Sequence, residues 1–297
     1  MKLHSLTEFA SGHQFLEGLR WHDGALWASD FFSKKVLKFS DDGSATTIAE
    51  IPGVPSGLGF LADGSTLVVS QTDTTIQRIA ADATVSTFAD FSSIAGGPGN
   101  DMLVNADGHV YVGNFGFAIG SEVPRPTALA HIDPQGNLSR VDGDVLFPNG
   151  MAVTPGGALL VAETFRHRIT AFDIEPDGSL SKQRVWAQLE ESFNPDGIAL
   201  DTDGGVWFGN ALTMGDDSGF YRVIEGGEIT DKVPVSGAQA VACAFGGDDL
   251  ATLYMSCNST TLEDFLEGRS SAVITAAEVG RVGAPAAPSA STSHIST

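Results

Sequence analysis

A unit that recurs six times along the chain constrains the fold more than any other feature of this sequence. Each copy holds a short apolar segment, a turn that often contains Asp-Gly, and a second β-rich segment. The copies start at Glu17, Ser56, Asn100, Asn149, Asp196 and Val241. Successive copies therefore begin 39, 44, 49, 47 and 45 residues apart, a period that fits four strands and their turns, which is one propeller blade. The sequence predicts an all-β fold, a six-bladed β-propeller.

The six copies fill most of the 297 residues, so we expect a single propeller domain over residues 1–283. The 35 Gly and 13 Pro are spread along the chain, as tight turns between short strands require. The segment Lys2–Phe9 is expected to close the ring by adding a strand to the last blade, because closure removes an exposed sheet edge. Residues 284–297 are rich in Ala, Pro, Ser and Thr, and we expect them to form a disordered tail.

The first residue of each copy indicates a central metal site. In a propeller the first strand of every blade lines the central channel, so the starts of these strands meet at one mouth. Four of the six starting residues carry a carboxylate or carboxamide oxygen: Glu17, Asn100, Asn149 and Asp196. Clustered carboxylates repel one another unless a cation or proton compensates, and an all-oxygen set suits hard cations. We expect one divalent cation, with Ca²⁺ favoured and Zn²⁺, Mn²⁺ or Mg²⁺ as alternatives.

The same segments also allow a purely structural interpretation. Phe147–Val153 and Asn194–Leu200 each contain a Pro-X-Gly tripeptide, and Pro55-Ser56-Gly57 is a third. Such tripeptides are ordinary turns in which Pro and Gly supply special backbone angles. Four oxygen-bearing residues in register favour metal binding. Both interpretations hold together if Pro and Gly shape the backbone while the middle residue reaches the ion.

The loops that follow the second strand of each blade should border the same mouth. They include Asp30–Ser33, Phe115–Pro126, Ala211–Ser218 and Asn258–Ser270. Their large apolar side chains are Phe31, Phe32, Phe115, Phe117, Met214, Phe265 and Leu266. Apolar loops beside a polar centre predict a substrate pocket; the alternative is that these side chains pack against one another. A helical turn or two is expected at Thr261–Glu267.

Composition and motifs exclude several other classes of protein. The formal net charge of −21 makes nucleic acid and anionic membrane surfaces unsuitable partners. No apolar run reaches the roughly 20 residues of a membrane helix, and no signal peptide is visible. Cys243 and Cys257 are not expected to pair, since a tight hairpin between them would place Cys243 near Thr252, and two thiols fit a cytoplasmic location. The sequence has no G-x-S-x-G elbow of a serine hydrolase, and its histidines lack zinc-ligand spacing.

Four segments carry a resemblance to a known family: Glu17–Trp21, Phe147–Gly150, Asn194–Asp201 and Phe245–Leu250. They resemble the gluconolactonase, regucalcin and luciferin-regenerating-enzyme family, whose members are six-bladed propellers with one catalytic divalent cation in the central channel. The resemblance implies metal ligands at Glu17, Asn149 and Asp196. Asn100 matches a family asparagine that contacts the substrate or, in the phosphotriesterase relatives, the metal itself.

The residues and the resemblance together predict a metal-dependent lactonase. The cation would polarise the carbonyl of the lactone and activate water, without a covalent nucleophile. Asp196 is the first candidate for the general base, with Glu17 as the second. Asn100 and the adjacent Asp101 complete the expected catalytic group, Asp101 acting from beside the ligands. The expected partner is a small-molecule lactone or ester.

One position departs from the family pattern. The sugar-lactone enzymes of the family carry an arginine two residues before the asparagine matched by Asn100, and this chain has Pro98 there. Together with the phenylalanines of the loops, this favours a less polar lactone or ester over a polyhydroxylated aldonolactone. Two alternatives stay open: a phosphotriesterase-like hydrolase on the same oxygens, and a non-catalytic propeller that binds Ca²⁺ or a protein partner. The sequence does not indicate the oligomeric state.

Overall fold

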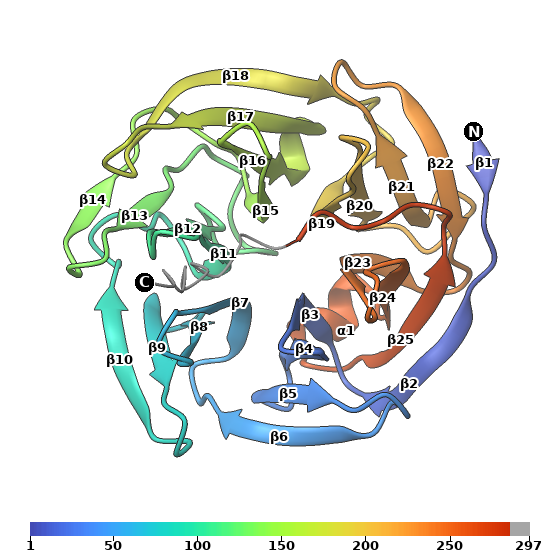
Figure 1. Cartoon of the computed structure of the whole chain (residues 1–297), viewed down its shortest axis with the longest axis horizontal. Helices are drawn as coiled ribbons and strands as arrows, with labels where there is room; N and C mark the ends of the chain where they lie inside the picture. Colours follow the sequence, from blue (N-terminus) through green and yellow to red (C-terminus); the bar gives the residue numbers. More distant parts are fainter. Residues whose placement is uncertain (286–297) are drawn as a thin grey trace, which may run out of the picture.

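A computed structural model describes residues 1–285, which form six sheets arranged in a ring around a central channel (Figure 1). Five of the sheets have four strands, and the sheet of the fifth blade has a fifth strand at its outer edge. Within each sheet, the strands that follow one another along the chain pair antiparallel. The predicted all-β, six-bladed propeller is confirmed.

In each blade the strands follow one another from the channel to the rim. The first three blades contain β3 (Leu16–His22), β4 (Ala25–Asp30), β5 (Lys35–Phe39), β6 (Ala45–Glu50), β7 (Pro55–Phe60), β8 (Thr66–Ser70), β9 (Thr75–Ile79), β10 (Val85–Asp90), β11 (Gly99–Val104), β12 (Val110–Asn114), β13 (Ala130–Ile132) and β14 (Leu138–Arg140). The last three contain β15 (Pro148–Val153), β16 (Ala158–Glu163), β17 (Arg168–Ile174), β18 (Leu180–Gln188), β19 (Pro195–Leu200), β20 (Val206–Asn210), β21 (Gly219–Val223), β22 (Ile229–Pro234), β23 (Gln239–Gly246), β24 (Thr252–Ser259) and β25 (Ser271–Glu278). The remaining elements are β1 (Lys2–Leu3), β2 (Thr7–His13), η1 (Thr164–Arg166) and α1 (Leu262–Leu266). The helix α1 lies within Thr261–Glu267, where the sequence predicts a helical turn.

The hydrophobic core lies between neighbouring blades. In one cluster, Leu67 and Val69 of β8 pack with Met102 of β11 and Val112 of β12, and all four are fully buried. Every residue of β8 and of β12 is buried, whereas most of β10 at the rim is exposed. Strands covered on both faces need apolar side chains on both. The sequences of these buried strands are therefore short apolar runs, without the alternation of polar and apolar residues that a half-exposed strand has.

The ring closes through β2, which pairs antiparallel with β25 in the last blade. The predicted closing segment, Lys2–Phe9, is therefore placed too close to the N-terminus. Its first residues form β1 and pair in parallel with β22 of the fifth blade. His4 accounts for the difference, because its Nε2 lies 2.9 Å from Asp231 Oδ1 and its backbone N–H donates to Lys232 O. These contacts hold the start of the chain on the fifth blade until it reaches Thr7.

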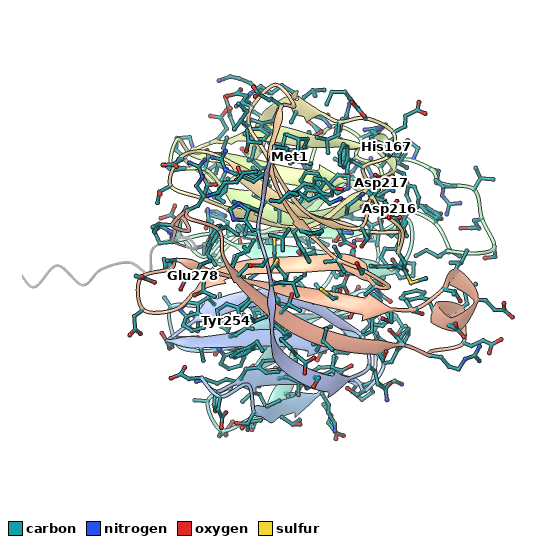
Figure 2. All side chains as sticks on the ribbon, turned by 90° about the vertical axis from the view of Figure 1, so that its right-hand side faces the viewer. Met1, His167, Asp216, Asp217, Tyr254 and Glu278 are labelled. Atoms are coloured by element: carbon teal, nitrogen blue, oxygen red, sulfur yellow. The ribbon has the colours of Figure 1, made fainter. Side chains whose placement is uncertain are left out.

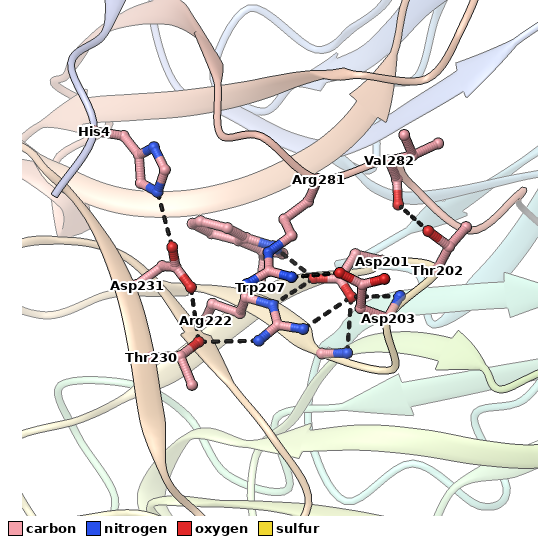
Figure 3. Close-up of polar contacts among 11 residues, drawn as sticks. His4, Asp201, Thr202, Asp203, Trp207, Arg222, Thr230, Asp231, Arg281 and Val282 are labelled. Atoms are coloured by element: carbon pink, nitrogen blue, oxygen red, sulfur yellow. Dashed lines mark hydrogen bonds and ion pairs between the residues drawn. The ribbon is translucent and has the colours of Figure 1, made fainter. Parts of the chain in front are cut away.

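A buried polar network stabilises the fifth blade (Figure 3). Arg222 donates from Nε and Nη2 to the two oxygens of Asp201, at 2.6 and 3.1 Å, and Trp207 Nε1 donates to the same carboxylate at 3.1 Å. The side chains of Arg222 and Asp201 are 4% and 0% exposed. Asp203 and Arg281 form an ion pair beside them. The network fixes the end of the described chain against this blade.

Cys243 and Cys257 are both buried and unpaired. Cys243 lies opposite Met255, three residues from the predicted neighbour Thr252, because Thr252 pairs with Gly246 and the turn is longer than expected. Among residues 1–285, no helix is long and apolar enough to cross a membrane. The backbone N–H of Ala284 donates to Leu200 O. The rest of the predicted tail, from residue 286 onward, lies outside the described residues.

Candidate functional site

The inner strands bring the starts of the repeats to one end of the channel. Each inner strand contacts the inner strands of both neighbouring blades. Glu17, Asn100, Asn149 and Asp196 are each the second residue of their strand. All four are buried. The structure thus gathers the four predicted ligands from blades one, three, four and five.

Every inner strand breaks its pairing register at this end. The breaks lie between Glu17 and Arg20, Pro55 and Leu58, Gly99 and Met102, Pro148 and Met151, Pro195 and Ile198, and Ala240 and Cys243. A β-bulge turns a side chain away from the direction that a regular strand would give it. A bulge of this kind occurs in all six blades, next to the position that carries the candidate ligands.

The structure corrects the interpretation of the Pro-X-Gly segments as turns. Pro148-Asn149-Gly150 opens β15 and Pro195-Asp196-Gly197 opens β19, so both belong to strands. A Cβ added to Gly150 would lie 2.4 Å from the backbone N of Ile198. The glycine is therefore needed because adjacent inner strands approach closely in the channel wall. The middle residue is left to present its side chain.

Hydrogen bonds fix the two amides of the site. Asn100 Nδ2 donates to Pro148 O at 2.8 Å. Asn149 Nδ2 donates to Thr164 Oγ1 at 3.4 Å. Because each amide nitrogen bonds to the surrounding scaffold, the amide oxygen is the atom left to face a ligand.

Two oxygens of the site have no hydrogen-bond partner. Among the buried side-chain nitrogen and oxygen atoms of residues 1–285, three lack a partner: Gln71 Nε2, Asn100 Oδ1 and Asp196 Oδ1. Asn100 and Asp196 are only 1% and 8% exposed. Buried polar atoms without a partner are costly and rare. Two such oxygens in one set fit direct coordination of a cation.

Burial and mutual repulsion perturb the two carboxyl groups. Desolvation, followed by the charge of Asp101, raises the pKa of Glu17 to about 7. Desolvation, followed by the charges of Glu17 and Asp101, raises the pKa of Asp196 well above its ordinary value. A cation among these groups would favour their ionised forms. Strong perturbation of neighbouring acids inside a channel is typical of a functional site.

Asp101 is held by Arg20, which is not among the site residues predicted from the sequence. Arg20 Nη2 donates to Asp101 Oδ1 at 2.7 Å and to Met102 O at 2.8 Å. The side chains of Arg20 and Asp101 are 18% and 5% exposed. The repeats contain a signal that identifies Arg20, since the equivalent residues in the other blades are uncharged. These are Gly59, Leu103, Ala152, Ala199 and Ala244.

The two remaining starting positions play supporting roles. Ser56 is fully buried, and its Oγ donates to Glu17 Oε2 at 2.9 Å. Val241 packs in an apolar cluster with Leu16 and Leu19. Over residues 1–285, no three His, Cys, Asp or Glu side chains form a metal-binding cluster. The candidate site therefore depends on its amide oxygens as much as on its carboxylates.

Many of the predicted loop side chains pack against other aromatic rings. Phe15 lies among Phe31, Phe32 and Phe265, at centroid distances of 5.6, 5.6 and 5.3 Å. These contacts join the loop of the first blade to α1 in the last blade.

A second aromatic group and a contact across the mouth cover the same face. Phe115 stacks on Phe147 at a centroid distance of 4.6 Å, and Phe117 packs on the same ring. A Cβ on Gly120 would lie 2.8 Å from Leu266 Cδ1, so loops of the third and last blades, on opposite sides of the ring, touch. Figure 2 shows α1 projecting from one face of the ring.

A cavity of about 520 Å³ opens at the other mouth of the channel. Its lining includes Arg20, Trp21, His22, Phe60 and Asp107, which lie at the far ends of the inner strands or in the turns beyond them. Arg20 thus lies between this cavity and the candidate ligands. The substrate pocket predicted at the ligand-bearing mouth stays a prediction.

A ring of six blades with buried carboxylates and amides at one mouth of the channel defines the class of protein. The family model described as the SMP-30/Gluconolactonase/LRE-like region matches residues 15–259. The chain belongs to this family, as the resemblance of its repeats predicted.

Individual relatives are distant. A 6-deoxy-6-sulfogluconolactonase of Pseudomonas putida is 26% identical over 130 residues, which span 43% of each chain. A pentonolactonase of Haloferax volcanii is 25% identical over 249 residues, 80% of each chain. Among solved structures, a luciferin-regenerating enzyme superposes with a TM-score of 0.78 at 17% identity, covering 93% of this chain and 95% of that one. A gluconolactonase from Xanthomonas campestris gives 0.73 at 20% identity, covering 92% and 89%. The structural matches establish the fold.

Proposed function

We propose that this protein is a metal-dependent hydrolase that opens a lactone ring at the mouth where Glu17, Asn149 and Asp196 meet. One observation carries the proposal: two carboxylates and two amides from four blades converge there, and two of their buried oxygens lack partners. Two relatives in the family are named as lactonases. Their names support a lactone as the class of substrate.

Glu17, Asn100, Asn149 and Asp196 would hold one divalent cation. Their oxygens are hard donors that suit Ca²⁺, with Mg²⁺, Mn²⁺ and Zn²⁺ as alternatives. A structural neighbour from Agrobacterium tumefaciens is described as the calcium-binding protein regucalcin, with a TM-score of 0.74. When bound, the ion supplies a Lewis acid for the carbonyl of the lactone.

The chain's own groups supply the proton transfer and the orientation. Asp196 has two carboxylate oxygens, so one can hold the ion while the other accepts the proton of the attacking water. Burial and the charges of Glu17 and Asp101 raise the pKa of this group, which makes its carboxylate a stronger base. Asn100, whose Nδ2 donates to Pro148 O, would hold the ion with its free amide oxygen and would thereby fix where the substrate carbonyl meets the ion. Asp101 is bound to Arg20, so we assign it a positioning role and not the proton transfer.

The substrate is proposed to be less polar than an aldonolactone. Pro98 offers no charged group beside Asn100. The face above the ligands carries the two aromatic groups around Phe15 and Phe147. Apolar walls with a few placed polar groups favour alkyl or aryl lactones.

The test is a substrate panel on protein freed of metal with a chelator and then reloaded separately with Ca²⁺, Zn²⁺, Mn²⁺ and Mg²⁺. We expect hydrolysis of a lactone to disappear with the chelator and to return with at least one ion, and alkyl or aryl lactones to exceed sugar lactones. Lactone turnover that is indifferent to chelator and ions would contradict the mechanism. A phosphotriester in the panel tests the phosphotriesterase alternative, and Ca²⁺ binding without any turnover would favour the non-catalytic one.

A further inference from the structure

We propose that Arg20 is a built-in counter-charge that matches the channel site to a divalent cation. The inference rests on the metal site proposed above and adds a residue to it. Arg20 would not contact the ion. It would act through Asp101, by donating a hydrogen bond to this third carboxylate and by compensating its charge.

The geometry shows how the fold makes room for this pair. Asp101 occupies the second position of its repeat, where the equivalent residues of the other blades are small. They are Gly18, Gly57, Gly150, Gly197 and Ala242. A Cβ on Gly57 would lie 2.5 Å from Asp101 Oδ1, so the absence of a side chain in the second blade leaves the space that Asp101 uses. Arg20 reaches the same oxygen from the first blade.

The charges of the buried groups then add up to the charge of a divalent ion. Glu17, Asp101 and Asp196 are at most 9% exposed, and ionised together they carry three negative charges. Arg20 contributes one permanent positive charge, because a guanidinium does not lose its proton in proteins. The remaining two negative charges balance Ca²⁺ or a similar ion. Without Arg20 this group of carboxylates would carry three negative charges and would favour a trivalent ion.

A purely structural brace is the competing explanation. Arg20 also donates to Leu19 O and Met102 O, and these bonds link the first and third blades. A brace would affect stability when removed, but it would leave the discrimination between ions of different charge unchanged. The ratio of affinities for Ca²⁺ and Tb³⁺, which have similar radii, separates the two explanations.

The experiment titrates chelator-treated full-length protein with Ca²⁺ and with Tb³⁺ in a calorimeter. In Arg20→Met we expect the preference for Tb³⁺ over Ca²⁺ to rise about tenfold or more, the effect of one unit charge several ångström away. Arg20→Lys should stay near the wild-type ratio. Asp101→Asn should shift the ratio in the opposite direction, and the Arg20→Met/Asp101→Asn double variant should return to the wild-type value.

Arg222→Met is the control, because it removes an even more deeply buried arginine from an ion pair outside the channel site. It should lower stability and leave the ratio unchanged. An unchanged ratio in Arg20→Met would overturn the inference while leaving the metal site intact; if that variant does not fold, an unchanged ratio in Asp101→Asn decides in the same way. A wild-type protein that binds neither ion would overturn the metal site as well.

Discussion

Glu17 and Asp196 are buried acids whose surroundings disfavour their charges in the metal-free protein. The causes are the same for both: loss of water first, then repulsion from the other carboxylates. Acids in this condition release protons when a cation binds. Both the metal affinity and the stability of the protein should therefore depend on pH.

The stability of the metal-free protein should reveal the pKa of Glu17. This pKa is raised from 4.5 to about 7 in the folded protein, so the folded state binds the proton more tightly than the unfolded state. The resulting stabilisation is complete below the unfolded value and is lost as the pH rises through the folded value. Urea unfolding in chelator should show that the stability of wild type relative to Glu17→Gln declines from about pH 5 to about pH 8.

Saturating Ca²⁺ should remove that decline, because the ion binds the ionised form of Glu17. The difference between wild type and Glu17→Gln separates this residue from other titratable groups, such as His22 and His131, whose pKa values are lowered by burial. A difference that stays constant with pH in chelator would contradict the assignment.

Asp196→Asn should abolish turnover and leave the fold intact. The change keeps the size of the side chain but removes both the charge and the proton acceptor. A general base alone accounts for about 10²–10⁴-fold in rate, so we expect at least that loss in lactone hydrolysis, with an unchanged circular dichroism spectrum. Asn149→Ala should behave similarly. Asp142→Asn, on an exposed loop, should retain full activity; a fully active Asp196→Asn would exclude Asp196 from the mechanism.

At the scale of the strand, the inner elements combine a bulge with a glycine that has no room for a side chain. In β15 the close neighbour of Gly150 is the backbone of β19, which cannot move aside as a flexible side chain would. The candidate ligands thus depend on strand packing as well as on their own chemistry.

Gly150→Ala should therefore destabilise the protein, by about 2 kcal/mol or more, as expected for overpacking against a fixed backbone. The measurement is the midpoint of urea unfolding together with Ca²⁺ affinity, and both should fall. Gly156→Ala in the following turn is the control, because its nearest neighbour would be 3.8 Å away. Equal stability of the two variants would show that the strands can separate without cost.

The sequence predicts these elements unevenly, for physical reasons. The inner strands are predicted accurately because their apolar runs and the following Asp-Gly turns recur at a regular spacing. The interpretation of Pro-Asn-Gly as a turn is wrong because local propensity takes no account of the backbone of the next blade, which packs against this segment but is distant in sequence. Arg20 is missed for a related reason, since its partner Asp101 is 81 residues away.

At the scale of the whole molecule, closure of the ring holds the first and last blades together. The N-terminal strand β2 covers the edge of β25. Sequence alone predicts that such a strand is needed. It does not locate the strand, because the contact between His4 and Asp231 involves residues far apart in the chain.

Deletion of residues 1–13 should destabilise the protein strongly and reduce its soluble yield, because it exposes the edge of β25. Deletion of residues 1–3, which removes β1 and keeps β2, should have a small effect. The thermal midpoints of the two truncated chains provide the comparison. Similar midpoints for wild type and for the chain that begins at residue 14 would show that β2 does not close the ring.

The most direct test of the central claim is the position of a bound ion. Crystals soaked in Mn²⁺ and measured at its absorption edge should give one strong anomalous peak in the channel, about 2.0–2.6 Å from oxygens of Glu17, Asn149 and Asp196. The peak should be absent from crystals of Asp196→Asn. A channel without a peak, or an ion bound only by other residues, would contradict the claim that these repeats hold a catalytic metal.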